Sequence, residues 1–356
     1  MNPPAQLEDI DTPAVAIDLG RAQSNIAKLQ GYLDEHGLAN RPHIKTHKLP
    51  FFAHMQVAAG APGITVQTVG EAEVMAAAGL KDLLLTYDVI GERKARRLAG
   101  VARTVDHLRV AVDNEVALTT VMRAAELAER TIGVLVEFES GKKRQGVLEP
   151  GAALTLARLA RSGRFTTFLG LLTYPCGPQA GAFIAAAEGL FAAEGVPLAV
   201  ISAGGTPNMW RAHEVPGLTE YRAGTSIYHD RRSVGSGSAT FDECALHVHV
   251  TLVSRPTADR GVIDAGSKVL TSDTVPESIG RGYGHILEYP DAVITELSEE
   301  HGAVDFSGCL KRPRIGERLR VIPNHVCPVS NLVDDVVIHQ EGRVMALMPV
   351  SARGKR

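Results

Sequence analysis

The sequence of 356 residues lacks the features of membrane, secreted and nucleic-acid-binding proteins. Its four cysteines are widely scattered and form no disulfide framework, so we expect a reduced, cytoplasmic protein. No apolar run approaches the roughly 20 residues that span a bilayer, and residues 1–12 lack the basic and apolar regions of a signal peptide. A formal net charge of -3 gives no indication of nucleic-acid binding.

The chain also lacks a Gly-x-Gly-x-x-Gly motif after an early strand, which weakens the alternative of an open, doubly wound sheet. Instead, short apolar segments alternate with amphipathic, Ala-rich segments from about residue 22 to about residue 230. This alternation predicts eight parallel strands covered by helices, which is a (β/α)8 TIM-like barrel. The predicted strands are residues 42–45, 64–67, 83–86, 108–112, 133–137, 168–173, 198–202 and 220–223.

The pattern changes after residue 240. Residues 245–254 alternate between polar and apolar side chains, residues 318–322, 333–340 and 343–348 continue in the same way, and helical patterning is sparse. This predicts an antiparallel β domain. We therefore expect a barrel over residues 20–235 and a β domain formed by residues 1–19 and 236–356.

The segment Arg41-Pro42-His43-Ile44-Lys45-Thr46-His47-Lys48 surrounds one lysine with imidazoles and cations. Neighbouring positive charge and burial lower the pKa of a lysine amine, which then can form a Schiff base with an aldehyde. A solvated basic surface or an anion-binding turn is the alternative explanation. The predicted strand order places Lys45 at the C-terminal end of the first barrel strand, the face at which such barrels build their active sites.

Two glycine-rich turns follow the last two predicted barrel strands. Gly204, Gly205 and Thr206 follow the seventh strand, and Gly224 and Thr225 follow the eighth. Glycines allow backbone N–H groups to approach phosphate oxygens, and loops at these two positions commonly bind phosphate in such barrels. A Schiff-base lysine together with a phosphate site indicates pyridoxal 5'-phosphate as the cofactor.

His325 and Cys327 form a third candidate group. In an extended segment, residues i and i+2 point to the same side, so the imidazole and the thiolate are able to hold one ion. This pair favours zinc over magnesium or calcium, and two ligands leave open positions for water or substrate. A purely structural role is the alternative.

Taken together, these motifs resemble those of pyridoxal-phosphate-dependent enzymes of the alanine-racemase fold. The similarity is to the branch that contains D-threonine aldolases and eukaryotic-type D-serine dehydratases, and it covers nearly the whole chain. It rests on Arg-Pro-His-x-Lys-Thr-His-Lys at 41–48, Gly-Glu-Ala-Glu at 70–73, Gly-Gly-Thr at 204–206, Asp-Ala-Gly-Ser-Lys at 264–268 and Pro-Asn-His-x-Cys-Pro at 323–328.

The resemblance implies a role for each candidate residue. Lys45 matches the lysine that bonds to the cofactor, and Tyr174 matches a tyrosine beside the pyridine ring. Arg144 matches an arginine of the active-site layer, and His43 is a further candidate acid–base or supporting group. The glycine-rich turns match the phosphate site, and His325 and Cys327 match the ligands of a divalent metal, zinc or manganese. Homodimers are usual in the family.

The predicted reaction is cleavage of D-3-hydroxy-amino acids of the D-threonine class to glycine and an aldehyde. The alternative is a D-serine or D-3-hydroxyaspartate dehydratase that releases a 2-oxo acid and ammonia, which the cysteine at position 327 favours. A racemase and a non-catalytic pyridoxal-phosphate carrier are further alternatives. The segments around Glu137 and Cys176 depart from the family's usual pattern near the substrate pocket, which leaves the substrate open.

Overall fold

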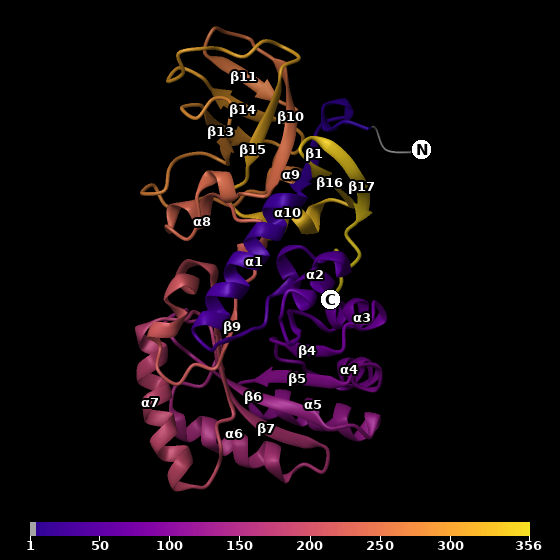
Figure 1. Ribbon diagram of the computed structural model, residues 1–356, viewed down its shortest axis with the longest axis vertical. Coiled ribbons are helices and arrows are strands. Elements are labelled where there is room, and N and C mark those ends of the chain that lie inside the picture. The colour runs from indigo at the N-terminus through magenta and orange to yellow at the C-terminus, as the bar shows by residue number, and fades with distance from the viewer. Residues whose placement is uncertain (1–4) are drawn as a thin grey trace. The chain divides into compact units, whose positions relative to one another are not determined.

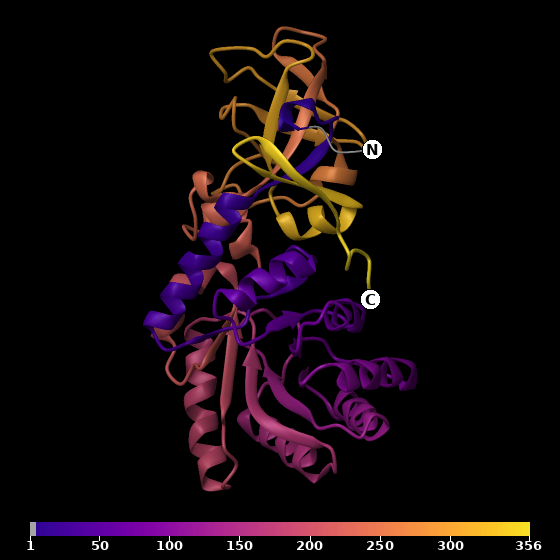
Figure 2. The same cartoon turned by 45° about the vertical axis from the view of Figure 1, so that its right-hand side comes forward.

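The structure is a computed structural model that describes residues 5–356 (Figures 1 and 2). Contacts between residues divide the chain into two compact units. We call them the barrel unit, which comprises residues 28–45, 49–224 and 354–356, and the β unit, which comprises the described residues up to 27 together with 46–48 and 225–353. The domain bounds expected from the sequence remain a prediction.

Eight parallel strands form the sheet of the barrel unit. They are β2 (Ala39–Asn40), β3 (Ile64–Val66), β4 (Asp82–Leu85), β5 (His107–Val112), β6 (Ile132–Phe138), β7 (Thr166–Thr173), β8 (Val200–Gly204) and β9 (Glu220–Arg222). They pair in the order β2-β9-β8-β7-β6-β5-β4-β3. A parallel bridge between His43 and Thr65, with a 2.8 Å hydrogen bond from the Thr65 N–H to the Pro42 carbonyl, joins the chain after β2 to β3. The predicted (β/α)8 barrel is confirmed.

Helices alternate with these strands, as the amphipathic segments of the sequence predict. They are α1 (Leu19–Glu35), α2 (Pro50–Ala58), α3 (Val69–Ala77), α4 (Glu92–Thr104), α5 (Glu115–Ala128), α6 (Pro150–Ser162) and α7 (Pro178–Ala193), with the short 3-10 helices η2 (Ile44–Thr46) and η3 (Thr206–Glu214). Successive helices from α3 to α7 pack against each other, and Figure 1 shows them beside the strands that they connect. Apolar faces of strands and helices therefore form the core between them.

The β unit contains nine strands and is mainly antiparallel. The strands are β1 (Ala14–Asp18), β10 (Leu246–Ser254), β11 (Arg260–Ile263), β12 (His285–Ile286), β13 (Val293–Leu297), β14 (Gly302–Asp305), β15 (Arg318–Ile322), β16 (Asp335–Gln340) and β17 (Arg343–Pro349). They pair in the order β13-β14-β11-β10-β1-β16-β17, and β15 pairs with β10 and β12. β1 pairs antiparallel with β10 and parallel with β16.

Short helices lie between the strands of the β unit. They are η1 (Leu7–Asp9), η4 (Thr225–Ile227), α8 (Arg231–Gly235), η5 (Phe241–Glu243), α9 (Ser267–Leu270) and α10 (Val326–Leu332). None of the four cysteines forms a disulfide. Within residues 5–356, no helix combines the length and the apolar character that crossing a bilayer requires.

Two local predictions were wrong. The first barrel strand ends at Asn40, and Lys45 lies in the 3-10 helix η2 rather than in a strand. Pro42 has no N–H to donate to a neighbouring strand, which limits the regular ladder there. Residues 325–327 are not extended throughout, because α10 begins at Val326 and only His325 keeps an extended backbone, with φ -147° and ψ 118°.

Candidate active site

Lys45 lies at the C-terminal end of the barrel, and its backbone is held by His43. The Lys45 N–H lies 3.4 Å from Nδ1 of His43, and Nε2 of the same ring lies 3.1 Å from Oε1 of Gln67 and 3.4 Å from Oγ1 of Thr86. Since Nδ1 accepts a hydrogen bond, Nε2 is the protonated nitrogen and donates to Gln67. His43 thereby ties the segment of Lys45 to the ends of β3 and β4.

The predicted phosphate turns end two neighbouring strands, β8 and β9. Gly204 pairs with Arg222, and a Cβ atom at position 204 would lie 2.5 Å from the Arg222 carbonyl oxygen. Gly205 has a φ of +120° and precedes η3, which begins at Thr206. Gly224 follows β9 after one residue. Small residues, a helix start and a threonine hydroxyl fit the phosphate of pyridoxal phosphate.

Tyr174 follows β7 and lies next to these turns. A Cβ atom at Gly205 would lie 3.2 Å from the Tyr174 ring, so glycine at position 205 allows the ring to approach. The guanidinium carbon of Arg144 lies 5.2 Å from the centre of the same ring. The structure therefore brings together Tyr174, Arg144 and the turn at Gly205, which lie far apart in the sequence.

Arg144 belongs to the loop after β6, and its other neighbour is Glu137. Its Nη2 lies 3.5 Å from Oε1 of Glu137, while Gln145 donates a 2.6 Å hydrogen bond to Oε2. Burial raises the pKa of Glu137, and the contacts with Gln145, Arg222 and Arg144 oppose that rise. The Arg144 side chain is 43% exposed, which leaves donor groups available to a bound anion.

His325 and Cys327 lie together in the β unit, and Asp230 holds the imidazole. Nδ1 of His325 lies 3.0 Å from Oδ2 of Asp230, which also accepts a 3.2 Å hydrogen bond from the Val326 N–H. Oδ1 of the same carboxylate caps α8 by accepting the Ser233 N–H at 2.8 Å. Because Nδ1 is engaged by Asp230, Nε2 is the ring nitrogen left for a metal ion.

Asp230 and Cys327 are the main groups that act on His325. Burial lowers the pKa of His325, but its hydrogen bonds with Asp230 and Cys327 outweigh burial and raise that pKa to about 10. Oγ1 of Thr46 lies 3.2 Å from Sγ of Cys327, and Oγ1 of Thr225 lies 3.9 Å from it. An imidazole and a sulfur ligand fit zinc or a similar divalent ion. Among residues 5–356, no group of three or more His, Cys, Asp or Glu side chains is arranged to hold a metal.

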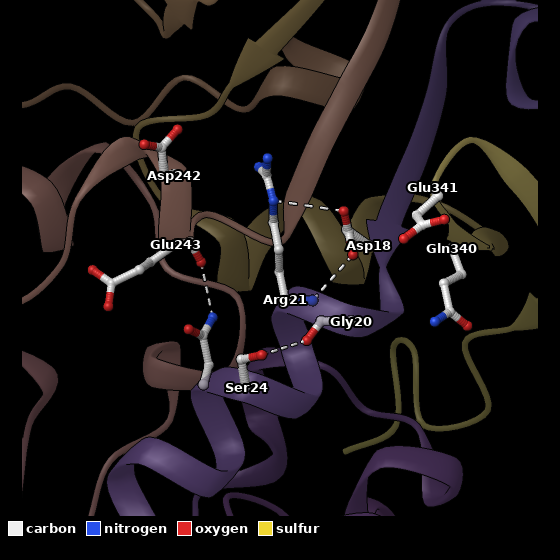
Figure 3. A pocket seen from close by; sticks show the side chains of 9 residues that line it. Asp18, Gly20, Arg21, Ser24, Asp242, Glu243, Gln340 and Glu341 are labelled. Carbon is white, nitrogen blue, oxygen red and sulfur yellow. Dashed lines mark hydrogen bonds and ion pairs between the residues drawn. The ribbon is translucent and has the colours of Figure 1, made fainter.

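A separate polar pocket of about 400 Å³ lies in the β unit and contains none of the predicted site residues (Figure 3). Nε of Arg21 lies 3.5 Å from the Asp18 carboxylate (Figure 3). Asn25 donates a 2.8 Å hydrogen bond to the Glu243 carbonyl. The hydrogen bonds and the ion pair drawn there join residues of the same unit. These contacts stabilise the local structure, and the residues that make them have no part in the predicted chemistry.

Sequence reasoning missed Asp230, Gln67 and Thr86. Asp230 lies 95 positions from His325, and no spacing rule connects two such residues. Gln67 and Thr86 are the last residues of two predicted strands and directly follow β3 and β4 in the structure, so their position at strand ends was the available signal. Glutamine and threonine are not typical catalytic residues, so position alone did not identify them as members of the site.

Comparisons with known proteins show the family of this chain. Residues 17–232 match the alanine racemase N-terminal domain, and residues 245–339 match the putative serine dehydratase domain. A D-threonine aldolase from Arthrobacter sp. is 34% identical, with 99% of this chain and 96% of that protein covered. A D-threo-3-hydroxyaspartate dehydratase from Delftia sp. is also 34% identical, with 89% and 91% covered.

Solved structures give the same result. The crystal structure of D-threonine aldolase from Filomicrobium marinum superposes with a TM-score of 0.88 at 28% identity and covers 99% of both chains. The protein is thus an alanine-racemase-fold enzyme, and the predicted class of pyridoxal-phosphate-dependent lyase is confirmed. The chain belongs to the family that contains the D-threonine aldolases and the D-threo-3-hydroxyaspartate dehydratases.

Proposed function

We propose that this protein is a metal-dependent D-threonine aldolase-like enzyme that cleaves D-3-hydroxy-amino acids to glycine and an aldehyde. The observation that carries the proposal is the pair His325 and Cys327, with Nδ1 of the histidine held by Asp230. Alanine has no β-oxygen, so a racemase has no evident use for a metal ligand pair. A substrate with a β-hydroxyl group has such a use.

Lys45, Tyr174 and the glycine-rich turns would hold pyridoxal phosphate. Lys45 would bond to its aldehyde carbon, and Gly204, Gly205, Thr206, Gly224 and Thr225 would surround its phosphate. When bound, this cofactor supplies an electron sink for negative charge at the substrate α-carbon. Arg144, with its exposed guanidinium, would bind the substrate carboxylate, and His43 would keep the backbone of Lys45 in place.

His325 and Cys327 would hold a zinc or manganese ion. That ion would lower the pKa of the substrate β-hydroxyl group and so ease loss of its proton. Asp230 would keep Nε2 of His325 directed at the ion by occupying Nδ1.

The dehydratase is the second candidate, and the cysteine at position 327 favours it. A solved relative, the D-threo-3-hydroxyaspartate dehydratase, has been studied as a cysteine-to-alanine mutant in a metal-free form. In a dehydratase, the Lys45 amine would remove the proton from the substrate α-carbon and the β-hydroxide would leave. Similarity to D-threonine aldolase over 99% of this chain supports the aldolase as the first choice. A homodimer is part of the same proposal, by analogy with the family.

Product analysis tests this choice. The purified holoenzyme is incubated with D-threonine, D-serine and D-3-hydroxyaspartate, with and without a chelator. Glycine and an aldehyde support the aldolase, whereas ammonia and a 2-oxo acid support the dehydratase. Full activity after complete metal removal would contradict the metal-dependent part of the proposal.

Two variants test the assigned residues. Lys45→Arg keeps the positive charge but cannot bond to the cofactor in the same way, so the visible absorbance band of the bound cofactor should disappear. Cys327→Ala should lose the metal, measured by elemental analysis, and most activity, while the cofactor band stays. Cys309→Ala is the matched control, because it removes another cysteine of the β unit and should change neither. Metal retained by Cys327→Ala would show that the pair is structural.

A further inference from the structure

Two carboxyl groups lie side by side at the C-terminal end of the barrel. Asp88 comes three residues after β4, and Asp113 directly follows β5, the strand next to β4. The Asp113 N–H donates to Oδ1 of Asp88 at 3.2 Å, and the two carboxyl groups are also within hydrogen-bond reach of each other. Neither residue has a role in the proposed function.

Asp113 holds the loop that carries Arg144. Its Oδ2 accepts a 2.7 Å hydrogen bond from the Gly146 N–H, while Oδ1 accepts one from Asn114. Gly146 has a φ of +112°, and a Cβ atom there would lie 2.5 Å from the Glu139 nitrogen. Only glycine fits this approach, and its backbone conformation presents the Gly146 N–H to Asp113.

The same loop is fastened at its base. The Val147 N–H donates to the Glu137 carbonyl at 2.9 Å, and the Glu139 N–H donates to the Val147 carbonyl at 3.1 Å. Between these points the chain leaves the sheet, and Arg144 reaches the Tyr174 ring from it. The bond from Gly146 to Asp113 is therefore the contact that joins this loop to the end of β5.

Two ionised carboxylates at this distance repel each other. The charged groups that act on Asp88 are Asp113 after β5 and Glu137 of β6, both negative when ionised. Burial, with the charge of Asp113 next, raises the pKa of Asp88 to about 7. At lower pH, protonated Asp88 donates a hydrogen bond to Asp113; at higher pH, that bond is replaced by repulsion.

We propose that Asp88 and Asp113 share one proton and, in that form, position the loop of Arg144 for the reaction proposed above. They are positioning residues, since neither acts on the substrate directly. Loss of the shared proton weakens the hold of Asp113 on Gly146, so Arg144 is less well placed. This inference rests on the proposed function, because it gives Arg144 its task there.

The test compares Asp88→Asn with the wild type as holoenzymes. In the wild type, kcat/KM should fall as the pH rises above about 7, mainly through KM. The asparagine amide donates to Asp113 at every pH, so this fall should be absent in Asp88→Asn. Asp113→Ala removes the contact with Gly146 and should raise KM by about tenfold to a hundredfold at all pH values. Asp106→Asn, at an exposed position of the same unit, is the control and should behave as the wild type.

A second readout does not depend on turnover. Amide hydrogen exchange of residues 139–147, corrected for the intrinsic pH dependence, should be faster at pH 8 than at pH 6 in the wild type and equal in Asp88→Asn. Equal exchange in the wild type, or an unchanged alkaline fall of kcat/KM in Asp88→Asn, overturns the shared proton. If the exchange result holds but no D-3-hydroxy-amino acid is turned over, the proposed function fails and the carboxyl pair stands.

Discussion

Buried polar side chains of the barrel unit and of the β unit differ in what they contact. In the barrel unit, the Arg41 side chain is 1% exposed and contacts both Glu220 and Asp82, the latter at 2.7 Å. Arg222, also buried, donates to Oγ of Ser202 at 2.9 Å and to the Thr173 carbonyl. The two buried arginines of the barrel unit thus each have hydrogen-bond or ion-pair partners. A buried charge is tolerated only with such partners.

The β unit instead buries three imidazoles, each of which has at least one ring nitrogen without a hydrogen-bond partner within residues 5–356. His247 and His249 lie on the same face of β10, and His339 lies opposite Asp18 on β16. They are 3%, 8% and 6% exposed, and Nε2 of each has no hydrogen-bond partner within residues 5–356. Burial, together with nearby positive charge, lowers the pKa of His247 to about 3 and that of His249 to about 4. These rings are neutral at neutral pH, and they make this unit sensitive to acid.

The largest expected effect is the loss of the buried cation in the barrel. Arg41→Met removes the guanidinium group that contacts the Glu220 and Asp82 carboxylates. The free energy of unfolding should therefore fall by about 3–5 kcal/mol. Urea unfolding followed by Trp210 fluorescence measures this, since Trp210 is the single tryptophan and lies in the barrel unit. Arg109 also contacts Asp82, at 3.2 Å. A loss below about 1 kcal/mol would mean that Arg109 compensates the buried carboxylates when Arg41 is removed. Buried charge in the barrel unit would then depend less on Arg41 than the contacts suggest.

An intermediate effect is expected at His247. In the unfolded chain His247 takes up a proton near pH 6.5, whereas in the folded chain it does so only near pH 3. Its contribution to the free energy of unfolding is therefore fully present above pH 6.5 and is lost as the pH falls from 6.5 towards 3. Between pH 6.5 and pH 5, the free energy of unfolding should therefore fall by about 2 kcal/mol less in His247→Leu than in the wild type. Amide exchange of β10 at the two pH values measures it. The same acid sensitivity in His247→Leu would assign the effect to other groups.

The smallest effect is expected for an exposed ion pair. Arg97 contacts Glu73 through two hydrogen bonds of 2.8 and 2.7 Å, but the two side chains are 33% and 41% exposed. Arg97→Ala should therefore reduce the free energy of unfolding by less than about 1 kcal/mol. Measured beside Arg41→Met, this variant separates the effect of burial from that of pairing. A loss as large as that of Arg41→Met would show that burial does not distinguish the two pairs.

Local patterning was sufficient to predict the barrel and the mainly antiparallel β unit, because alternating apolar segments determine where strands and helices lie. It was less reliable near Lys45, where Pro42 interrupts the strand, and at Cys327, which lies in the first turn of α10. Contacts such as Asp230 with His325, or Asp113 with Gly146, depend on how distant segments pack. No spacing in the sequence encodes them.

Asp230 has a consequence for how the ligand pair can change during evolution. Its two carboxylate oxygens fix His325 on one side and the start of α8 on the other, and neither interaction involves residue 327. Of the two proposed ligands, His325 is therefore held by the scaffold, while Cys327 is a side chain at the start of a short helix. In the proposed metal site, a substitution at position 327 would exchange a soft sulfur ligand for a harder oxygen ligand while the contact between Asp230 and His325 stays in place. If the proposed site binds a metal ion, its metal preference would change through single substitutions at position 327.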